Sequence, residues 1–304
     1  MRPIPRFALP WFITVALMAI CATVCSAAAA PASGLPTSLA RPATEMAGEL
    51  LKRYTDKSQH LTAGHLNRSF SITSEARDGA ARGEALAEIH VSLSVLRAVL
   101  TQPERWCEIL LLTPHVAGCA SMEGGSDARF EVKLLYRYDQ PADEAKRAQF
   151  RFEQRLSQPE FLSVRLASPQ GPLGTQDYRL ELEAAALDEQ RSVLKVEYSY
   201  RYGIRAAAAL GFYLATTGRQ KQGFTLGEEG EPVRGLRGSV ERNAMRYFLA
   251  IESHALCAEK DAAMRFQVSL DQWLRALEPY PGQIAEADPD DYRRIKLEQF
   301  GSLP

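Results

Sequence analysis

The sequence predicts an α+β fold in which a curved antiparallel sheet packs against one long C-terminal helix, with extra helices at both ends. Two stretches place apolar or aromatic residues at every second position, as half-buried strands do. The first contains Phe130, Val132, Leu134, Tyr136 and Tyr138, and the second contains Leu194, Val196, Tyr198, Tyr200 and Tyr202. One long helical segment, 236–256, follows these strands. A sheet followed by such a helix can enclose an apolar interior.

Residues 1–30 have the composition of a secretory signal peptide. Two arginines lie within the first six residues, the apolar stretch 11–24 is shorter than a bilayer-spanning helix, and small residues follow at 26–30. The β-branched residues before Cys21 and Cys25 argue against lipid attachment at either cysteine. We therefore expect cleavage near the end of the small-residue stretch and a periplasmic or secreted protein.

The charge balance argues against nucleic acid as a partner. The full chain carries 36 basic and 37 acidic residues, and loss of Arg2 and Arg6 leaves 34 basic against 37 acidic residues, a formal charge of −3. No basic stripe remains to follow a phosphate backbone. The mature chain, about 270 residues long, is within the range of one large domain and is apolar enough to form a core.

The pattern of apolar residues and turn residues gives the order of the elements. We expect, in turn, a Pro- and Ser-rich lead-in with a helix at 44–56, and hairpin strands at 69–75 and 85–91 joined by a turn through Asp78-Gly79 and Gly83. Helices are expected next at 92–101 and 104–111, on either side of Pro103, followed by a brief strand at 115–119. Five further strands are expected at 130–138, 148–156, 161–167, 178–184 and 193–202, and helices at 204–216, 233–257, 266–277 and 290–300.

The helix at 204–216 is Ala-rich and apolar on nearly every side, with only Arg205 charged. Such a helix must be buried, dock on a partner or cover an opening. One hypothesis is a lid or membrane-docking element over a cavity, and the alternative is an added layer of the core.

Cys107, Cys119 and Cys257 remain after removal of the signal, in a compartment that favours disulfides. Cys107 ends a predicted helix and Cys119 lies in the next strand, so a bond between them would close a short loop. Such a loop is worth roughly 3 kcal/mol. We expect this disulfide, with two buried thiols as the alternative.

The order of elements resembles the START-like helix-grip superfamily, which includes lipid-transfer START domains, plant Bet v 1-type binders and polyketide cyclases. The stretch from Gly83-Glu84-Ala85 to Cys119, with Pro103-Glu104-Arg105-Trp106 inside it, is similar to the opening hairpin, the helical pair and the strand that follows. Residues 242–251 resemble the gripping helix. The likeness covers 63–258, about two thirds of the chain.

The resemblance implies a helix-grip fold with a cavity for a hydrophobic molecule between sheet and helix. It divides the chain into a signal peptide (1–30), a lead-in with an N-terminal helix (31–62), a helix-grip domain (63–260, with an insertion at 203–233) and a C-terminal helical extension (261–304). The insertion and the extension depart from the family pattern. Fold alone does not say whether the molecule is carried, sensed or transformed.

The long helix can be divided into faces at 100° per residue. One face carries Val240, Ala244, Tyr247, Phe248, Ile251 and Ala255, with Asn243 and His254 beside it, whereas Arg242, Arg246 and Ser253 point away. Together with strand tyrosines, the expected ligand-binding residues are Tyr136, Tyr198, Tyr200, Asn243, Tyr247, Ile251 and His254. The alternative is that Tyr247 packs in the core and that Asn243 and His254 lie at the edge of the helix face without meeting a ligand. The strand tyrosines would then reflect only the preference of tyrosine for strands.

Searches for reactive motifs find no nucleophile elbow, zinc-binding His pair, Walker loop or dinucleotide glycine pattern. We therefore expect no catalytic residue, metal site or cofactor. The main hypothesis is an exported protein that binds one hydrophobic small molecule or lipid, with a transient membrane or envelope-protein contact through 204–216. The alternatives are a cyclase or aromatase in which Tyr247 and His254 handle protons, and a ligand-free interaction module of the cell envelope.

Overall fold

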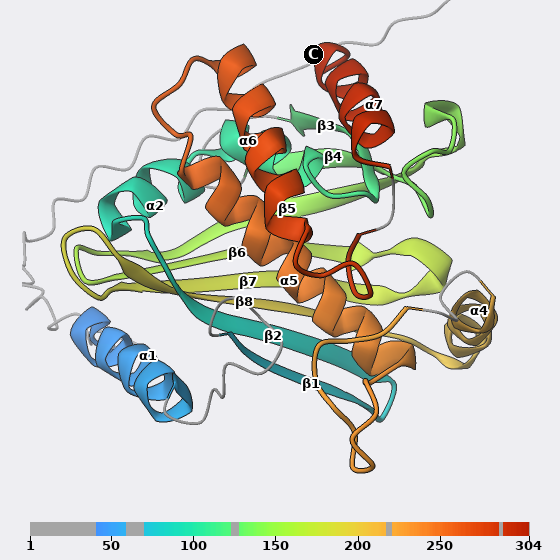
Figure 1. Ribbon diagram of the computed structural model, residues 1–304, viewed down its shortest axis with the longest axis horizontal. Helices are drawn as coiled ribbons and strands as arrows, with labels where there is room; N and C mark the ends of the chain where they lie inside the picture. Colours follow the sequence, from blue (N-terminus) through green and yellow to red (C-terminus); the bar gives the residue numbers. More distant parts are fainter. Residues whose placement is uncertain (1–40, 59–69, 123–127, 217–220, 286–287, 304) are drawn as a thin grey trace, which may run out of the picture. The chain divides into compact units, whose positions relative to one another are not determined.

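The computed structural model describes residues 41–58, 70–122, 128–216, 221–285 and 288–303 (Figure 1). The expected signal peptide lies outside the described residues. The helices are α1 (Ala43–Ser58), α2 (Leu93–Leu100), α3 (Pro103–Leu111), α4 (Ile204–Ala215), α5 (Gly235–Ala255), α6 (Ala262–Leu277) and α7 (Pro289–Gly301). The strands are β1 (Ser71–Arg77), β2 (Ala80–Ile89), β3 (Val116–Met122), β4 (Arg129–Leu134), β5 (Lys146–Ser157), β6 (Phe161–Gln170), β7 (Gln176–Ala186) and β8 (Ser192–Arg201).

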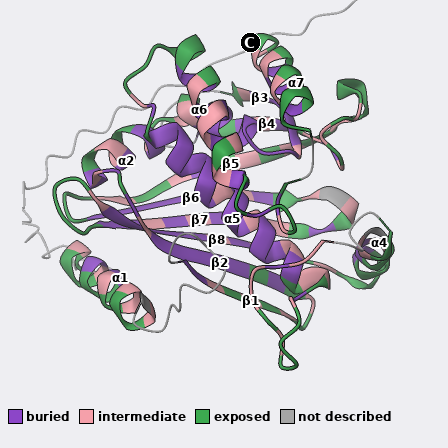
Figure 2. Cartoon of the chain, viewed as in Figure 1, coloured by how far each residue is buried: buried purple, intermediate pink, exposed green. Residues whose placement is uncertain are grey.

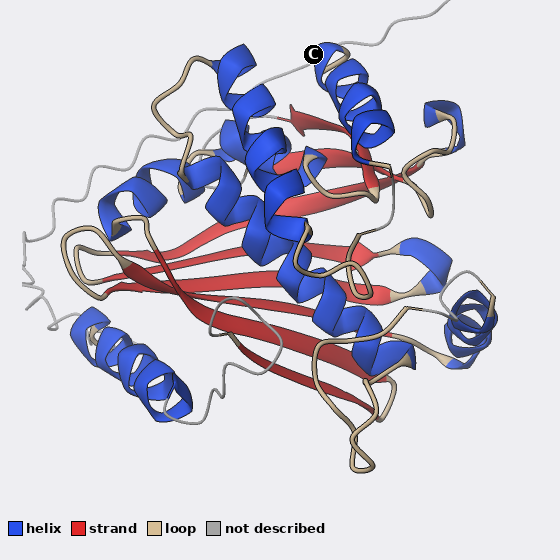
Figure 3. Ribbon diagram, in the orientation of Figure 1, coloured by secondary structure: helices blue, strands red, loops and turns tan. Residues whose placement is uncertain are grey.

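In the described part of the chain, eight strands form one sheet in the order β1-β2-β8-β7-β6-β5-β4-β3. Every neighbouring pair is antiparallel. The helices α2 and α3 carry the chain from β2 to β3 at the opposite edge, and α5 crosses one face of the sheet (Figure 3). This arrangement is the helix-grip fold, as the order of elements in the sequence predicted.

Local signals in the sequence set the boundaries of the first elements. Asp78 and Gly79 both have positive φ, 52° and 72°, as a tight two-residue hairpin turn requires. The Ser92 hydroxyl accepts a hydrogen bond from the amide of Val95 and caps α2. Pro103 opens α3, where its missing N–H is of no consequence.

The helix α1 covers the face of the sheet opposite α5. Its apolar side packs in a separate small cluster, formed by Ala47, Leu50, Leu86, Phe161, Ala185 and Val193. At the same face, Arg53 pairs with the buried Glu84, and the Tyr54 hydroxyl donates to Glu88 at 3.1 Å. The N-terminal helix is therefore a structural cover of the outer face, away from the gripping helix.

The helix α5 approaches the sheet most tightly at Gly83 of β2. A Cβ atom at this position would lie 2.4 Å from the carbonyl oxygen of Val240, so only glycine fits there. Ala81 and Ala85, the next residues of β2 on the same face, are also small and buried. This close contact fixes one side of α5 against the sheet.

A third layer of helices buries the remaining sides of α5 (Figure 2). The helix α6 packs on α5 and buries Phe266 and Trp273. Met245, Leu249 and Leu256 form a second apolar stripe in the sequence, opposite the first face of the long helix, and the sequence predicts that the helix at 266–277 with Trp273 covers it. Met245 and Leu249 are buried, whereas Leu256, just after α5, is 51% exposed. The second apolar side of α5 is thus covered by α6, as the sequence predicted.

The helix α7 is attached to the connection between α3 and β3. The Tyr292 hydroxyl donates to the carbonyl of Leu112 at 2.7 Å, and Lys296 Nζ donates to the carbonyls of Thr113 and Val116 at 2.7 and 2.6 Å. Burial lowers the pKa of Lys296 well below its ordinary value. These bonds fix the C-terminal extension to the main body.

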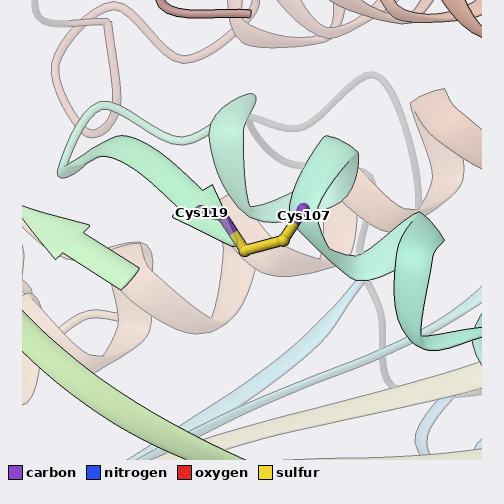
Figure 4. The surroundings of a disulfide bond; sticks show 2 residues. All are labelled: Cys107 and Cys119. Carbon is purple, nitrogen blue, oxygen red and sulfur yellow. A yellow bond between two sulfur atoms is a disulfide. The ribbon is translucent and has the colours of Figure 1, made fainter. Parts of the chain in front are cut away.

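The expected disulfide joins Cys107 of α3 to Cys119 of β3, with their Cα atoms 5.2 Å apart (Figure 4). The disulfide lies beside the connection between α3 and β3, to which α7 is hydrogen-bonded. Cys257 is buried and is not in a disulfide.

The strand β4 is shorter than the sequence predicts, because it ends at Leu134 instead of continuing to Tyr138. The side-chain carbonyl of Gln140 accepts hydrogen bonds from the amides of Tyr136 and Arg137, both at 2.9 Å. Both amides are therefore hydrogen-bonded to Gln140 and do not pair with a neighbouring strand. The alternation of side chains in the sequence does not reveal that a nearby glutamine takes the place of the strand partner.

Candidate ligand cavity

A cavity of about 130 Å³ lies between α5 and the half of the sheet formed by β4 to β8. Its sheet wall is apolar and includes Val132, Phe150, Leu166 and Leu180. A dry apolar cavity of about this size accommodates a benzene molecule, whereas pockets for larger ligands commonly reach roughly 300–1,000 Å³. The enclosed space therefore suits one ring or a short chain.

Four tyrosines form an aromatic cluster in this cavity. Tyr178 and Tyr200 stack with ring centroids 5.2 Å apart and planes 14° apart. Tyr198 contacts Tyr178 edge-on at 5.7 Å and reaches Tyr247 of α5 at 5.8 Å. The cluster thus joins the sheet to the gripping helix and occupies part of the interior between them.

The phenols of this cluster stay neutral. Burial raises the pKa of Tyr198 well above its ordinary value and also raises the pKa values of Tyr178, Tyr200 and Tyr247. A neutral phenol can donate and accept a hydrogen bond. The tyrosines therefore present neutral hydroxyl groups on large apolar rings. Such hydroxyl groups can orient a ligand through hydrogen bonds without adding charge to the cavity.

The side of the cavity formed by α5 and the segment before it is cationic. Arg242 and Arg246, one turn apart on α5, both line the cavity and are each 3% exposed. Lys221 lines the same cavity, and its burial together with the charges of Arg246 and Arg242 lowers its pKa to about 7. Burial, followed by the charges of Arg246 and Lys221, also lowers the pKa of His115 well below 6.5.

Five of the seven predicted ligand-binding residues line this one cavity: Tyr136, Tyr198, Tyr200, Asn243 and Tyr247. Ile251 and His254 do not line it. Ile251 is fully buried in the core. His254 has a suitable direction on the helical wheel, but it follows Asn243 by eleven residues, about 16 Å along an α-helix. A helical wheel shows the direction in which each side chain points, but it does not show how far apart two residues such as Asn243 and His254 lie along the helix axis.

His254 belongs to a buried polar cluster with Glu108 of α3 and Arg265 of α6. Its Nε2 atom lies 3.0 Å from Glu108, and Arg265 contacts both carboxylate oxygens, at 2.8 and 2.5 Å. Burial would raise the pKa of Glu108, but the hydrogen bonds from His254 and Arg265 lower it to about 2. Burial lowers the pKa of His254, and Glu108 only partly offsets this effect. The pair Tyr247 and His254, on which the cyclase hypothesis depended, is therefore not assembled around the cavity.

The orientation expected for two arginines was wrong. Arg242 and Arg246 were predicted to point away from the interior, yet they line the cavity. Periodicity assigns charged residues to the solvent side of a helix, but here the segment before α5 approaches that side, and Arg242 donates a hydrogen bond to the carbonyl of Gln222 at 3.4 Å. The available signal was their spacing of four residues, which places both on the side of Asn243 and Ser239.

The helix α4 closes one end of the cavity. Leu210 and Leu214 line the interior, and Ala206 and Leu210 are buried. On its outer side Ile204 is 92% and Phe212 73% exposed. The helix is thus apolar toward both the cavity and the surroundings.

Among the residues that the structure describes, no group of His, Cys, Asp and Glu side chains is arranged to hold a metal ion. None of the described helices combines the length and the apolar character needed to cross a bilayer.

Comparisons with known proteins give likeness at the level of fold. No family model matches the sequence, and no curated protein is significantly similar to it. Norcoclaurine synthase from Thalictrum flavum, solved with dopamine and hydroxybenzaldehyde, matches at 14% identity and a TM-score of 0.37, over 66% of this chain and 97% of its own. The Zhui aromatase/cyclase from Streptomyces sp. R1128 matches at 12% identity and a TM-score of 0.31, over 67% of this chain and 99% of its own.

A conserved protein from Geobacillus kaustophilus matches at 13% identity and a TM-score of 0.35, over 58% of this chain and 95% of its own. Likeness of this degree carries no argument about ligand or activity. The sheet order and the position of α5 nevertheless show the architecture directly. By its own topology the chain has the helix-grip fold.

Proposed function

We propose that this chain is an exported protein that binds a small hydrophobic molecule in the cavity between α5 and the sheet. The cavity itself is the observation that supports this function, because an apolar sheet wall with a few polar tips is the usual composition of a ligand site.

Export is part of this proposal. It is supported by the composition of residues 1–30 and by the disulfide between Cys107 and Cys119, which persists in an oxidising compartment. Mass spectrometry of the protein from its native compartment tests export. The mature chain should begin near residue 29, and an intact N-terminus would contradict it.

The lid is the second part of the proposal. A cavity of about 130 Å³ is too small for a whole lipid, so a lipid ligand would require α4 to move outward. The outer side of α4 exposes Ile204 and Phe212, and Arg201 and Arg205 are exposed beside them. Apolar side chains flanked by cations favour transient contact with an anionic membrane surface.

Calorimetric titration with benzyl alcohol, a neutral one-ring probe that matches the cavity volume of about 130 Å³, tests ligand binding. We expect saturable binding to the wild-type protein and its loss in Leu180→Trp, which fills the cavity from its sheet wall. Leu187→Trp is the matched control, because Leu187 lies at the β7–β8 turn, is 36% exposed and does not line the cavity. If the probe fails to bind, or if Leu180→Trp binds it as well as the wild type, the binding function is wrong and the ligand-free interaction module is favoured.

Vesicle flotation tests the membrane contact separately. Vesicles with about one third anionic lipid should carry the wild-type protein to the top of the gradient at low salt. The double variant Ile204→Ser, Phe212→Ser should remain below. Equal flotation of the two proteins would show that α4 is not the contact.

A further inference from the structure

Aromatic side chains are concentrated around the cavity. Phe, Trp and Tyr make up 9% of the full chain, whereas six of the 24 described residues that line the cavity are aromatic. These six are Tyr136, Phe150, Tyr178, Tyr198, Tyr200 and Tyr247. They come from β5, β7, β8, α5 and the segment after β4, so the enrichment belongs to the enclosed space and not to one element.

The preference of tyrosine for strands does not account for this distribution, because that preference applies along the whole of a strand. Leu194 and Val196 occupy inward positions of β8 outside the cavity, and both are aliphatic and fully buried. The next two inward positions, Tyr198 and Tyr200, line the cavity. Aromatic rings therefore occur where β8 borders the cavity, and aliphatic side chains occur where it borders the packed core.

The tyrosine rings hold one another in place. Tyr198 meets Tyr178 and Tyr200 edge-on, with planes 77° and 66° apart and centroids 5.7 and 6.0 Å apart, while Tyr178 and Tyr200 stack at 14°. These are the edge-to-face and offset-stacked arrangements that aromatic rings prefer, since their faces are negative and their edges positive. A wall of rings that is already ordered loses little conformational freedom when a ligand binds.

We propose that the ligand contains an aromatic ring, which packs against the rings of Tyr178, Tyr198 and Tyr200 and extends their cluster. This inference rests on the proposed binding function and adds the chemical class of the ligand. A flat ring of the size of benzene matches the volume of about 130 Å³. The ligand class is therefore a small one-ring aromatic compound, which the cavity selects over a saturated compound of similar size.

Contact between rings is the physical basis of this selection. A saturated ring buries at least as much apolar area as an aromatic ring with the same number of carbons, so the hydrophobic effect alone does not favour the aromatic ligand. An aromatic pair adds roughly a twofold to tenfold gain in affinity beyond the burial of area. A preference for the aromatic ring would therefore report the tyrosines and not the apolar character of the cavity in general.

Three alcohols that share one CH₂OH group test the ring alone. Benzyl alcohol is aromatic, cyclopentylmethanol has a saturated ring of nearly the same volume, and cyclohexylmethanol has a saturated ring with the same number of carbons. The saturated pair controls for size and for carbon count. Calorimetric titration of the full mature protein should show that benzyl alcohol binds about threefold or more tightly than either saturated alcohol.

Variants assign the preference to the tyrosines. In Tyr200→Leu the ratio of the affinities for benzyl alcohol and cyclopentylmethanol should fall toward one, whereas Tyr200→Phe keeps the ring and should keep the ratio. Tyr178→Leu removes the stacked partner and serves as a second variant if Tyr200→Leu does not fold. Tyr54→Leu is the control, because Tyr54 lies on α1 at the opposite face of the sheet and does not line the cavity.

The outcomes separate this inference from the proposed function. If the wild type binds benzyl alcohol no more tightly than cyclopentylmethanol, the aromatic class is wrong and the binding function is unaffected. A ratio unchanged in both Tyr200→Leu and Tyr178→Leu also overturns the inference, because the preference would then not come from these rings. Absence of binding by all three alcohols overturns both proposals.

Discussion

The Nε2 atom of His254 lies 3.0 Å from the carboxylate of Glu108, and this buried contact joins the end of α5 to α3. Arg265 approaches the same carboxylate from α6, so one acidic group links three helices. The cluster explains how the C-terminal extension is held on the gripping helix. It also removes His254 from the list of residues that could meet a ligand.

Replacement of Glu108 by Gln should destabilise the protein strongly. Arg265 would remain buried without its counter-charge, and loss of one partner from a buried pair costs about 3–5 kcal/mol. Urea unfolding followed by circular dichroism measures the difference. Glu131→Gln, which breaks the exposed pair with Arg147, is the control and should change stability by about 1 kcal/mol or less. Equal effects of the two substitutions would contradict the structural role of the cluster.

The same cluster should make the protein sensitive to acid. The pKa of Glu108 is about 2 in the folded protein, below its ordinary value of 4.5, so its contribution is present above pH 4.5 and is lost as the pH falls toward 2. The pKa of His254 is also lowered, so the unfolded chain takes up a proton first as the pH falls below 6.5. Melting temperatures between pH 7 and 3 should decline, and the decline should be shallower in Glu108→Gln. Parallel curves for the two proteins would refute this assignment.

Gly83→Ala tests the close approach of α5 to β2. The new methyl group would lie 2.4 Å from the Val240 carbonyl oxygen, so helix and strand would have to separate. Overpacking of this kind costs about 1–3 kcal/mol. Gly48→Ala is the control, because a Cβ atom there has no neighbour within 4 Å and lies in α1; it should stabilise the protein by about 0.5–1 kcal/mol. The melting temperature of Gly83→Ala should therefore fall below that of the wild type, and the melting temperature of Gly48→Ala should rise above it.

Removal of the disulfide should lower stability without changing the fold. The Cys107–Cys119 bond closes a loop with a sequence separation of 12, and the chain-entropy model assigns roughly 3 kcal/mol to a loop of this length. The double variant Cys107→Ser, Cys119→Ser should show this loss in urea unfolding, and a reducing agent should lower the wild-type midpoint similarly. The double variant itself should not respond to the reducing agent; a response would point to Cys257 instead.

The sequence alone determined the order of the elements and the nature of the sheet face. Alternation at Val196, Tyr198 and Tyr200 fixed one face of β8, and Pro103 and Asp78-Gly79 fixed where helices and turns begin, because these signals act over a few residues. Five tyrosine and asparagine positions of the cavity followed from the same alternation and from the helical wheel. The pairing of Cys107 with Cys119 followed from their places in consecutive elements.

Only the tertiary structure decided which polar residues of α5 would face the cavity. Periodicity predicted cover on two apolar sides of this helix, but it does not show that the segment before the helix also encloses Arg242 and Arg246. The helical wheel therefore places both arginines away from the interior, and it places His254 at the cavity although His254 lies about 16 Å beyond Asn243 along the helix axis. The contact that decided the position of His254 joins it to Glu108, 146 residues earlier in the chain, and no local pattern in the sequence records such a contact.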